Sequence, residues 1–396
     1  MWLVGVLTAA VACATTWLVT PAIVRLAHRV GALDHPGPRK IHAAPIPRGG
    51  GVAVFLGFAA GLTFAVFATG YATNEQHARA AYWAILAVAA AAILILGIVD
   101  DIRPVSFQWK FLFQILAASA VWAAGFRVQM VGVPFVSDTV QLGWLSLPLT
   151  VLWIVGITNA FNLIDGLDGL ATGTALITTT VVAVIAIHGD RVAVSAISVA
   201  LVGALAGFLR YNFVPAQIFL GDSGSMFLGF SIAVISIHGA QKNVTAVAVF
   251  IPLLIMGYPI LDTGIAIARR LNSIRSDAPN RGSVRYIARN AYRVFLPDRG
   301  HLHHRLLEAG ISHRGAVLSL YGCVIALAGA ALVLVVSNSL VVAIILASSL
   351  TFLTIAFFAF IILRARLARR RSKAEQAAAP PSSPRAVTPG GVLGRH

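Results

Sequence analysis

The chain has 396 residues, of which 58% are hydrophobic and only 11% are charged, and its mean hydropathy is +0.84. Soluble domains carry about a quarter charged residues, so this composition excludes a water-soluble globular protein and indicates a polytopic membrane protein. The formal net charge of +16 could suggest a nucleic-acid partner, but membrane proteins also use Lys and Arg to fix their topology. The two cysteines, Cys13 and Cys323, both lie in apolar runs, so the sequence supports neither a disulfide framework nor a thiolate metal site.

Apolar segments recur along the chain. A membrane span needs about 20 predominantly apolar residues. The first segment has no small-residue cleavage site and polar domain after it, so it is expected to be a retained span. Eleven candidate spans lie at about residues 2–20, 49–70, 82–99, 109–124, 143–161, 169–187, 191–209, 216–237, 244–267, 315–336 and 340–363.

The positive charges are unequally divided between the two sides of these spans. If the connections alternate sides, one side receives all but four of the 30 Lys and Arg residues, that is 26. The positive-inside rule places this side in the cytoplasm and the N-terminus outside. The predicted fold is therefore an all-α polytopic membrane protein with about 11 transmembrane helices, an outer N-terminus and a cytoplasmic active-site face.

The composition changes abruptly after the last expected span. Residues 1–363 are predicted to form the membrane domain, and residues 364–396 a basic, Ala/Pro/Ser-rich cytoplasmic tail that is disordered. The Arg cluster at the start of this tail is expected to contact anionic membrane lipids. Topology and lipid contact account for the positive charge, so no nucleic-acid partner is predicted.

Five polar clusters interrupt the apolar sequence, and all five fall on the predicted cytoplasmic side. Ionisable groups at membrane depth are candidates for function. The clusters are "DHPGPRKIHAAPIPRGGG" (34–51), "DDIRPVSFQWK" (100–110), "TNAFNLIDGLDGLATG" (158–173), "FLGDSGS" (219–225) and "PDRGHLHHRLLEAG" (297–310).

Acidic residues stand at the ends of the expected spans. A lone Asp there most often caps or ends a helix. Glycines beside the acids of "DGLDG" and "GDSGS" favour a binding site, and carboxylates that face one basin repel one another unless a cation is present. Oxygen ligands favour Mg²⁺, with Mn²⁺ as the alternative. The acids are Asp100, Asp101, Asp165, Asp168 and Asp222.

The cationic candidates have two interpretations each. Three imidazoles could hold zinc, but the spacing of His301, His303 and His304 lacks the common i, i+4 pattern. With Arg305, they fit phosphate binding better. Lys110 is either an interfacial anchor or, if the connection after Asp100 bends, a member of the acidic basin.

Two weaker features remain open. The "RGGG" at 48–51 could form an anion-binding nest, but it lacks a P-loop's following Lys-Ser/Thr and could be an ordinary turn. Phe219 could be a core aromatic or a platform for a planar base, and the residues alone favour the core.

These residue types suit transfer of a phosphorylated group from a soluble donor to a lipid acceptor. At the five motifs the chain resembles the polyprenyl-phosphate N-acetylhexosamine-1-phosphate transferases, the family of MraY, WecA and TagO, over about residues 20–363. The resemblance implies a Mg²⁺-dependent enzyme that moves a sugar 1-phosphate from a UDP-sugar to undecaprenyl or decaprenyl phosphate and releases UMP. It also implies an inner or plasma membrane location.

The resemblance assigns a role to each motif. It implies Asn162 and Asp222 as the Mg²⁺ ligands, Asp100 with Asp101 beside the lipid phosphate, and Lys110 as a phosphate ligand. Donor-binding roles fall on the remaining positions. Phe219 would stack on uracil, and the other implied substrate-binding residues are Asp165, Asp168, His301, His303, His304 and Arg305.

The motifs "RKIHAAPIPRGGG" and "PDRGHLHHRLLEAGISHR" resemble the WecA and TagO branch, which implies UDP-N-acetylglucosamine as donor and a product that primes a cell-envelope polymer. Another UDP-N-acetylhexosamine or UDP-MurNAc-pentapeptide is the alternative donor. A transporter is the alternative class, but it should place ionisable groups at the bilayer midplane and contain internal repeats, of which the sequence has none. The sequence does not assign a role to the Arg-rich segment 271–296. It also leaves open whether displacement is direct or in two steps, and whether the protein forms oligomers such as a homodimer.

Overall fold

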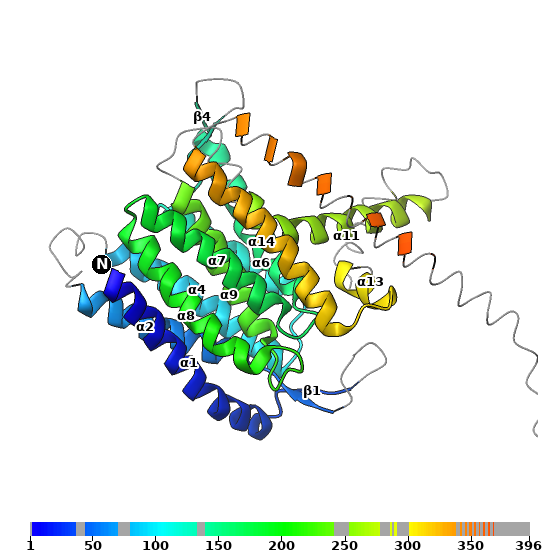
Figure 1. Ribbon diagram of the computed structural model, residues 1–396, viewed down its shortest axis with the longest axis horizontal. Helices are drawn as coiled ribbons and strands as arrows, with labels where there is room; N and C mark the ends of the chain where they lie inside the picture. The colour runs from blue at the N-terminus through cyan, green and yellow to red at the C-terminus, as the bar shows by residue number, and fades with distance from the viewer. Residues whose placement is uncertain are drawn as a thin grey trace, which may run out of the picture.

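The computed structural model describes residues 2–36, 44–69, 80–132, 139–240, 253–277 and 301–337, with isolated positions at 286–290 and 341–367. Helices dominate these residues (Figure 1). They are α1 (Trp2–Val30), α2 (Gly50–Ala68), α4 (Ala80–Ile102), α5 (Phe107–Ala123), η1 (Gly143–Leu145), α6 (Ser146–Ile164), α7 (Leu170–His188), α8 (Val192–Asn212), α9 (Gly221–Ala240), α11 (Gly257–Ser276), α13 (Leu302–Glu308) and α14 (His313–Ser337).

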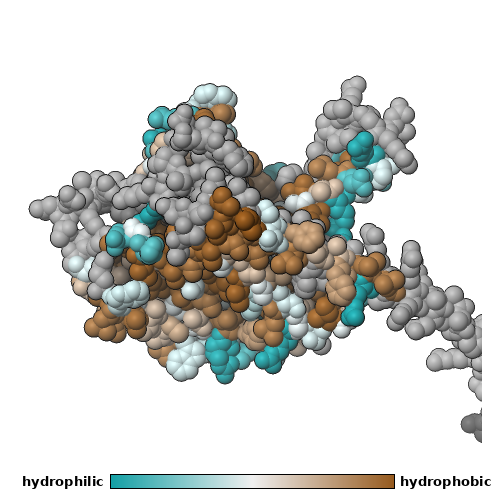
Figure 2. Space-filling model, turned by 45° about the horizontal axis from the view of Figure 1, so that its top comes forward, coloured by the Kyte–Doolittle hydropathy of each residue, from teal (hydrophilic) through white to brown (hydrophobic). Residues whose placement is uncertain are grey.

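The protein is a multi-pass membrane protein. Within the described residues, seven helical segments are long and apolar enough to cross a bilayer. They are Trp2–Val30, Gly50–Ala68, Ala84–Ile102, Gly143–Ile164, Leu170–His188, Val192–Asn212 and His313–Val335. Hydrophobic residues cover the middle of the face drawn in Figure 2, as a lipid-facing surface requires.

The other four predicted spans are outside this set for different reasons. The segment at 109–124 forms α5, which has only 17 residues, and the segment at 216–237 forms α9, whose described apolar stretch is Gly221–Ile237. The segment at 244–267 is described only from residue 253, and the one at 340–363 only at isolated positions. Most of the predicted tail, 364–396, also lies outside the described residues.

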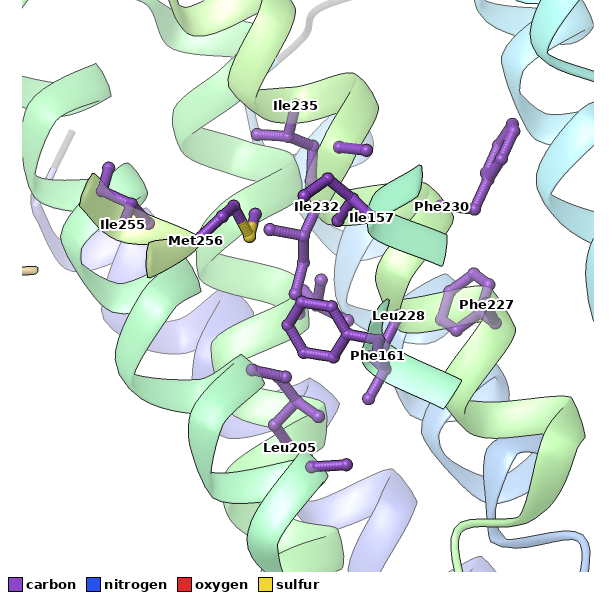
Figure 3. Packing of buried hydrophobic residues seen from close by; sticks show 14 of the residues in the cluster. Ile157, Phe161, Leu205, Phe227, Leu228, Phe230, Ile232, Ile235, Ile255 and Met256 are labelled. Atoms are coloured by element: carbon purple, nitrogen blue, oxygen red, sulfur yellow. The ribbon is translucent and has the colours of Figure 1, made fainter. Parts of the chain in front are cut away.

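Helix α9 is the core of the bundle. It packs against α2, α4, α6, α7 and α8, and every residue from Ser223 to Ile237 is buried. A helix that is apolar on all sides has no face to present to water, so burial on all sides stabilises it. Figure 3 shows α9 side chains such as Leu228 among Phe161 of α6 and Leu205 of α8. The polar first turn of α9 therefore lies at the centre of one end of the bundle.

Two short antiparallel ladders, absent from the predicted all-α fold, mark the two ends of the bundle. β1 (Leu33–Asp34) pairs with β2 (Ile46–Pro47), and β3 (Met130–Gly132) pairs with β4 (Thr139–Gln141). In Figure 1, β1 and α13 lie at the lower end and β4 at the upper end. Helix α11 extends from the bundle on the side of α13.

Candidate active site

Lys110 joins two acidic side chains from different helices. Its ammonium group donates to Asp100 Oδ2 at 2.5 Å and to Asp222 Oδ2 at 2.7 Å. Helix α4 ends shortly after Asp100, because Pro104 lacks an N–H and disfavours helical geometry at Arg103. The chain then turns, and α5 returns Lys110 to the end of α4. Of the two interpretations that the sequence left open for Lys110, the structure has the bent connection and not the interfacial anchor, while the role of Lys110 as a phosphate ligand stays a prediction.

Asp101 holds the first turn of α9. Its Oδ1 accepts a hydrogen bond from the Asp222 N–H at 2.9 Å, and its Oδ2 accepts from the N–H and the hydroxyl of Ser223 at 3.1 and 2.7 Å. These are N–H groups that a helix start leaves without intrahelical partners. The helix-capping interpretation of a terminal Asp, which the sequence left open, thus describes Asp101.

Gly221 makes this contact with Asp101 geometrically feasible. Its φ of +74° lies in the left-handed region, which glycine adopts without the strain that a Cβ imposes. A Cβ at this position would also lie 2.5 Å from Asp101 Oδ2. The glycine of "GDSGS" is therefore required both by the backbone and by the carboxylate beside it.

Asn162 brings an amide to the same place from the last turn of α6. Its Nδ2 donates to Ser225 Oγ at 3.0 Å, and its side chain also interacts with the Asp222 carboxylate. Asp100 and Asp222 are themselves close enough to interact directly. Two carboxylates thus share one ammonium group and leave a deficit of positive charge beside an amide. A divalent cation with oxygen ligands fits these residues.

The loop between α6 and α7, residues 165–169, lies beside this acidic cluster. Burial raises the pKa of Asp165 well above its usual range, and the charges of Asp222 and Asp101 raise it further. Asp168 ties the loop to its surroundings: its Oδ2 accepts from Ala216 N–H at 2.9 Å, and its own N–H donates to His313 Nε2 at 3.2 Å. The two acids of "DGLDG" therefore have different surroundings.

Phe219 lies beside the start of α2. Its N–H donates to Pro47 O at 2.8 Å, and its carbonyl accepts from Gly50 N–H at 3.0 Å. The Gly51 N–H similarly donates to Leu220 O at 3.0 Å. Backbone hydrogen bonds thus join the "RGGG" stretch to the "FLGD" loop, and the N–H groups of Gly50 and Gly51, which an anion nest would use, already have carbonyl partners. Phe219 is half-buried, so neither of its two interpretations is favoured.

The histidines of "HLHH" form a stack at the start of α13. The rings of His301 and His303 lie nearly parallel with centroids 5.7 Å apart, and the His304 ring is 4.4 Å from that of His303. His301 is buried and its Nδ1 lies 2.9 Å from Asp262 Oδ2. Burial and the neighbouring His304 lower the pKa of His303 to about 3, so this ring is neutral at physiological pH. Arg305 belongs to the same short helix.

Asp262 belongs to none of the five polar clusters, although it lies inside the expected span at 244–267. A carboxylate inside an otherwise apolar segment is costly without a partner, and this position is the feature by which the sequence marks Asp262.

Among the described residues, no group of three or more His, Cys, Asp and Glu side chains has the arrangement of a metal site. The proposed cation would instead take one carboxylate and one amide from the protein, with water and phosphate oxygens completing its shell.

Known proteins are similar to this chain over most of its length. Residues 83–240 match the family model described as glycosyl transferase family 4. The chain is 42% identical over 307 residues to the Bacillus subtilis protein named Probable undecaprenyl-phosphate N-acetylglucosaminyl 1-phosphate transferase, covering 78% of each chain. It is 36% identical over 340 residues to the Decaprenyl-phosphate N-acetylglucosaminephosphotransferase of Mycobacterium tuberculosis, covering 81% of this chain and 78% of the relative.

A second group of known proteins is similar to this chain over a shorter length. The Phospho-N-acetylmuramoyl-pentapeptide-transferase of Listeria monocytogenes is 38% identical over 175 residues, which cover 41% of this chain and 53% of the relative. The extended matches are thus to N-acetylglucosamine 1-phosphate transferases, as the resemblance at the motifs implied. By identity and coverage, this chain belongs to the polyprenyl-phosphate N-acetylhexosamine-1-phosphate transferase family, in its N-acetylglucosamine-transferring branch.

Proposed function

We propose that this membrane enzyme transfers N-acetylglucosamine 1-phosphate from UDP-N-acetylglucosamine to undecaprenyl or decaprenyl phosphate. The products are polyprenyl-diphosphate-N-acetylglucosamine and UMP, and the lipid product would prime a cell-envelope polysaccharide. The observation that carries the proposal is the Lys110 ammonium between Asp100 and Asp222, with Asn162 beside them. This arrangement would provide cationic and metal-binding groups at one end of an apolar bundle, where a lipid phosphate and a soluble nucleotide can meet.

Asp222 and Asn162 would hold Mg²⁺, with Mn²⁺ as a substitute. The cation would supply charge neutralisation for the donor diphosphate. Support comes from the donor set itself: a carboxylate and an amide converge where the carboxylate charge exceeds that of the one lysine. Asp101 would contribute indirectly, because its oxygens hold the helix turn that presents Asp222.

Asp100 would orient the acceptor. In the transfer step, an oxygen of polyprenyl phosphate attacks the β-phosphorus of the donor, and the bond from that phosphorus to the bridging oxygen breaks. The bridging oxygen leaves with UMP. Asp100 would take the proton of a monoprotonated acceptor phosphate, and Lys110 would stabilise negative charge on the phosphates. Positioning and charge stabilisation account for most catalysis in such transfers.

The donor would bind toward the 165–169 loop and α13. Support is the position of this loop, which interacts electrostatically with Asp222 and contacts the histidine stack through Gly166. Phe219 would stack on uracil, with Asp165 and Asp168 nearby. His301, His304 and Arg305 would meet the diphosphate, while the buried neutral ring of His303 supports a packing role.

The finer topology is part of the proposal. The chain would have eleven spans, an outer N-terminus and its active site on the cytoplasmic face of the plasma or inner membrane. The excess of Lys and Arg on one side supports this orientation. So does the common location of α13 and β1 at one end of the bundle (Figure 1).

Donor competition tests the proposed substrate. Purified protein in detergent would receive polyprenyl phosphate, Mg²⁺ and radiolabelled UDP-N-acetylglucosamine. Unlabelled UDP-N-acetylglucosamine, UDP-N-acetylgalactosamine and UDP-MurNAc-pentapeptide would be added as competitors in parallel. Lipid-linked label that falls with unlabelled UDP-N-acetylglucosamine and resists the other two is expected. Stronger competition by UDP-MurNAc-pentapeptide than by unlabelled UDP-N-acetylglucosamine would reassign the donor.

A further inference from the structure

Asp262 is a buried carboxylate in the second turn of α11, 2% exposed, and it makes two contacts across to the start of α13. Its Oδ1 accepts a hydrogen bond from the Leu302 N–H at 2.8 Å. Its Oδ2 lies 2.9 Å from His301 Nδ1. One side chain thus ties two segments that are about 40 residues apart in the sequence.

These two contacts determine the protonation of the His301 ring. An ionised carboxylate can only accept hydrogen bonds, and the Leu302 N–H can only donate. The His301 Nδ1 must therefore carry a proton for its contact with Asp262 to be a hydrogen bond. In the neutral ring, Nε2 is then the acceptor nitrogen, because the bond made by one ring nitrogen sets the tautomer.

Helix α13 contacts the loop at 165–169 through His303. His303 packs against Gly166 so closely that a Cβ on that glycine would lie 2.4 Å from His303 Nε2. His303 is also stacked on His301, the ring that Asp262 holds. Among the described contacts, the path from Asp262 to the loop therefore runs through two imidazoles.

We propose that Asp262 is a positioning residue for donor binding, which holds His301 in its Nδ1-protonated form and fixes the histidine stack against the 165–169 loop. This inference rests on the proposed function only in identifying the ligand of the stack as the uridine diphosphate of the donor. Asp262 lies inside a separate helix and acts through His301, so it is not itself a catalytic residue.

The first test replaces Asp262 by asparagine, which keeps the size but can present an N–H to His301 Nδ1. Wild type, Asp262→Asn and the matched control Asp277→Asn, an exposed acid at the end of α11, would be compared for transfer and for UMP binding by calorimetry. For Asp262→Asn, the KM for the UDP-sugar and the Kd for UMP should rise about ten-fold, the loss of one hydrogen bond to a charged group. The control should match wild type. Unchanged constants in Asp262→Asn would overturn the proposal.

A double-mutant cycle tests whether Asp262 acts through His301. If it does, Asp262→Asn should add little to the loss already present in His301→Gln, because the two residues form one unit. Fully additive losses in KM would contradict this coupling. A purely structural role for Asp262 would lower the unfolding temperature without this dependence on His301.

A nitrogen spectrum of the wild-type protein reports the protonation of the His301 ring directly. With ¹⁵N-labelled histidine, and His301→Gln to assign the signal, Nδ1 of His301 should have the shift of a protonated nitrogen, with and without UMP. A bare Nδ1 would overturn the proposal. The spectrum needs no turnover, so absence of transfer with correct UMP binding would count against the proposed reaction and not against Asp262.

Discussion

The Asp101 carboxylate accepts a hydrogen bond from the backbone N–H of Asp222 at 2.9 Å, so the second acid of one motif fixes the acid of another. Asp101 is buried, and its negative charge faces the positive end of the α9 dipole. Asp100, one residue earlier, instead contacts the Lys110 ammonium. Two adjacent acids thus serve different purposes, one in the helix start and the other in the charge cluster.

Asp101→Ala should reduce stability and turnover together. It removes the acceptor of three hydrogen bonds and leaves N–H groups of Asp222 and Ser223 buried without partners, at a cost of about 2–4 kcal/mol. Asp100→Ala should abolish turnover with a smaller fall in unfolding temperature. Thermal unfolding in detergent and label transfer would be measured on both. Wild-type stability with no activity in Asp101→Ala would show that Asp101 acts directly on a substrate.

Gly221→Ala should destabilise the protein. The left-handed φ and the 2.5 Å approach to Asp101 Oδ2 both oppose a Cβ, so a loss of about 2 kcal/mol or more is expected. Gly156→Ala is the matched control. This glycine lies in α6 with nothing within 4 Å of its added Cβ, so alanine there should be neutral or stabilising by up to about 1 kcal/mol. Equal unfolding temperatures for the two variants would contradict the geometry around Asp101.

Lys110→Met should lower turnover about 100-fold or more. The change leaves Asp100 and Asp222 without their shared ammonium group and removes a cation from the proposed phosphate site. Arg103→Met removes one positive charge from the exposed connection before α5 and should leave turnover near wild type. The kcat of the three proteins would be compared at saturating donor and Mg²⁺. Similar losses in both variants would point to general surface charge and not to the bridge.

His303 should make the protein sensitive to acid. Its folded pKa is about 3, against an ordinary value of 6.5, so the unfolded state binds a proton first as the pH falls. Between about pH 6.5 and pH 3, the contribution of His303 to the free energy of unfolding should therefore fall by about 1.4 kcal/mol per pH unit. Asp165, whose pKa is raised, acts with the opposite sign, so variants must be compared at each pH.

His303→Gln should flatten the fall in unfolding temperature between pH 7 and pH 5. The exposed His188 provides the control, because His188→Gln should leave that pH dependence as it is in wild type. A His303→Gln profile parallel to the wild-type one would mean that His303 is already protonated or accessible in the folded protein.

The sequence predicted the acidic cluster well because its members end or begin helices whose boundaries have local causes. Pro104 ends α4, and the apolar run after Asp222 requires a buried helix. The return of Lys110 to Asp100 was one of two alternatives, because the sequence did not show that the chain turns between α4 and α5. Membership of the family was also predicted correctly, because the motifs that carry it are contiguous in the sequence.

Other features depend on contacts that a single sequence does not reveal. The partners of "RGGG" are the carbonyls of Phe219 and Leu220, about 170 residues away. The capping role of Asp101 required knowing that α4 and α9 meet. Asp262 could be recognised as unusual but not paired, since its partner His301 lies on a separate short helix.

The position of a phosphorus label tests the central claim most directly. Wild-type protein would be incubated with polyprenyl phosphate, Mg²⁺ and UDP-N-acetylglucosamine labelled with ³²P in the β-phosphate. Transfer of N-acetylglucosamine 1-phosphate predicts that the label moves to the lipid and that the released UMP is unlabelled. Label retained in released UDP, or a lipid fraction without label, would contradict the proposed function.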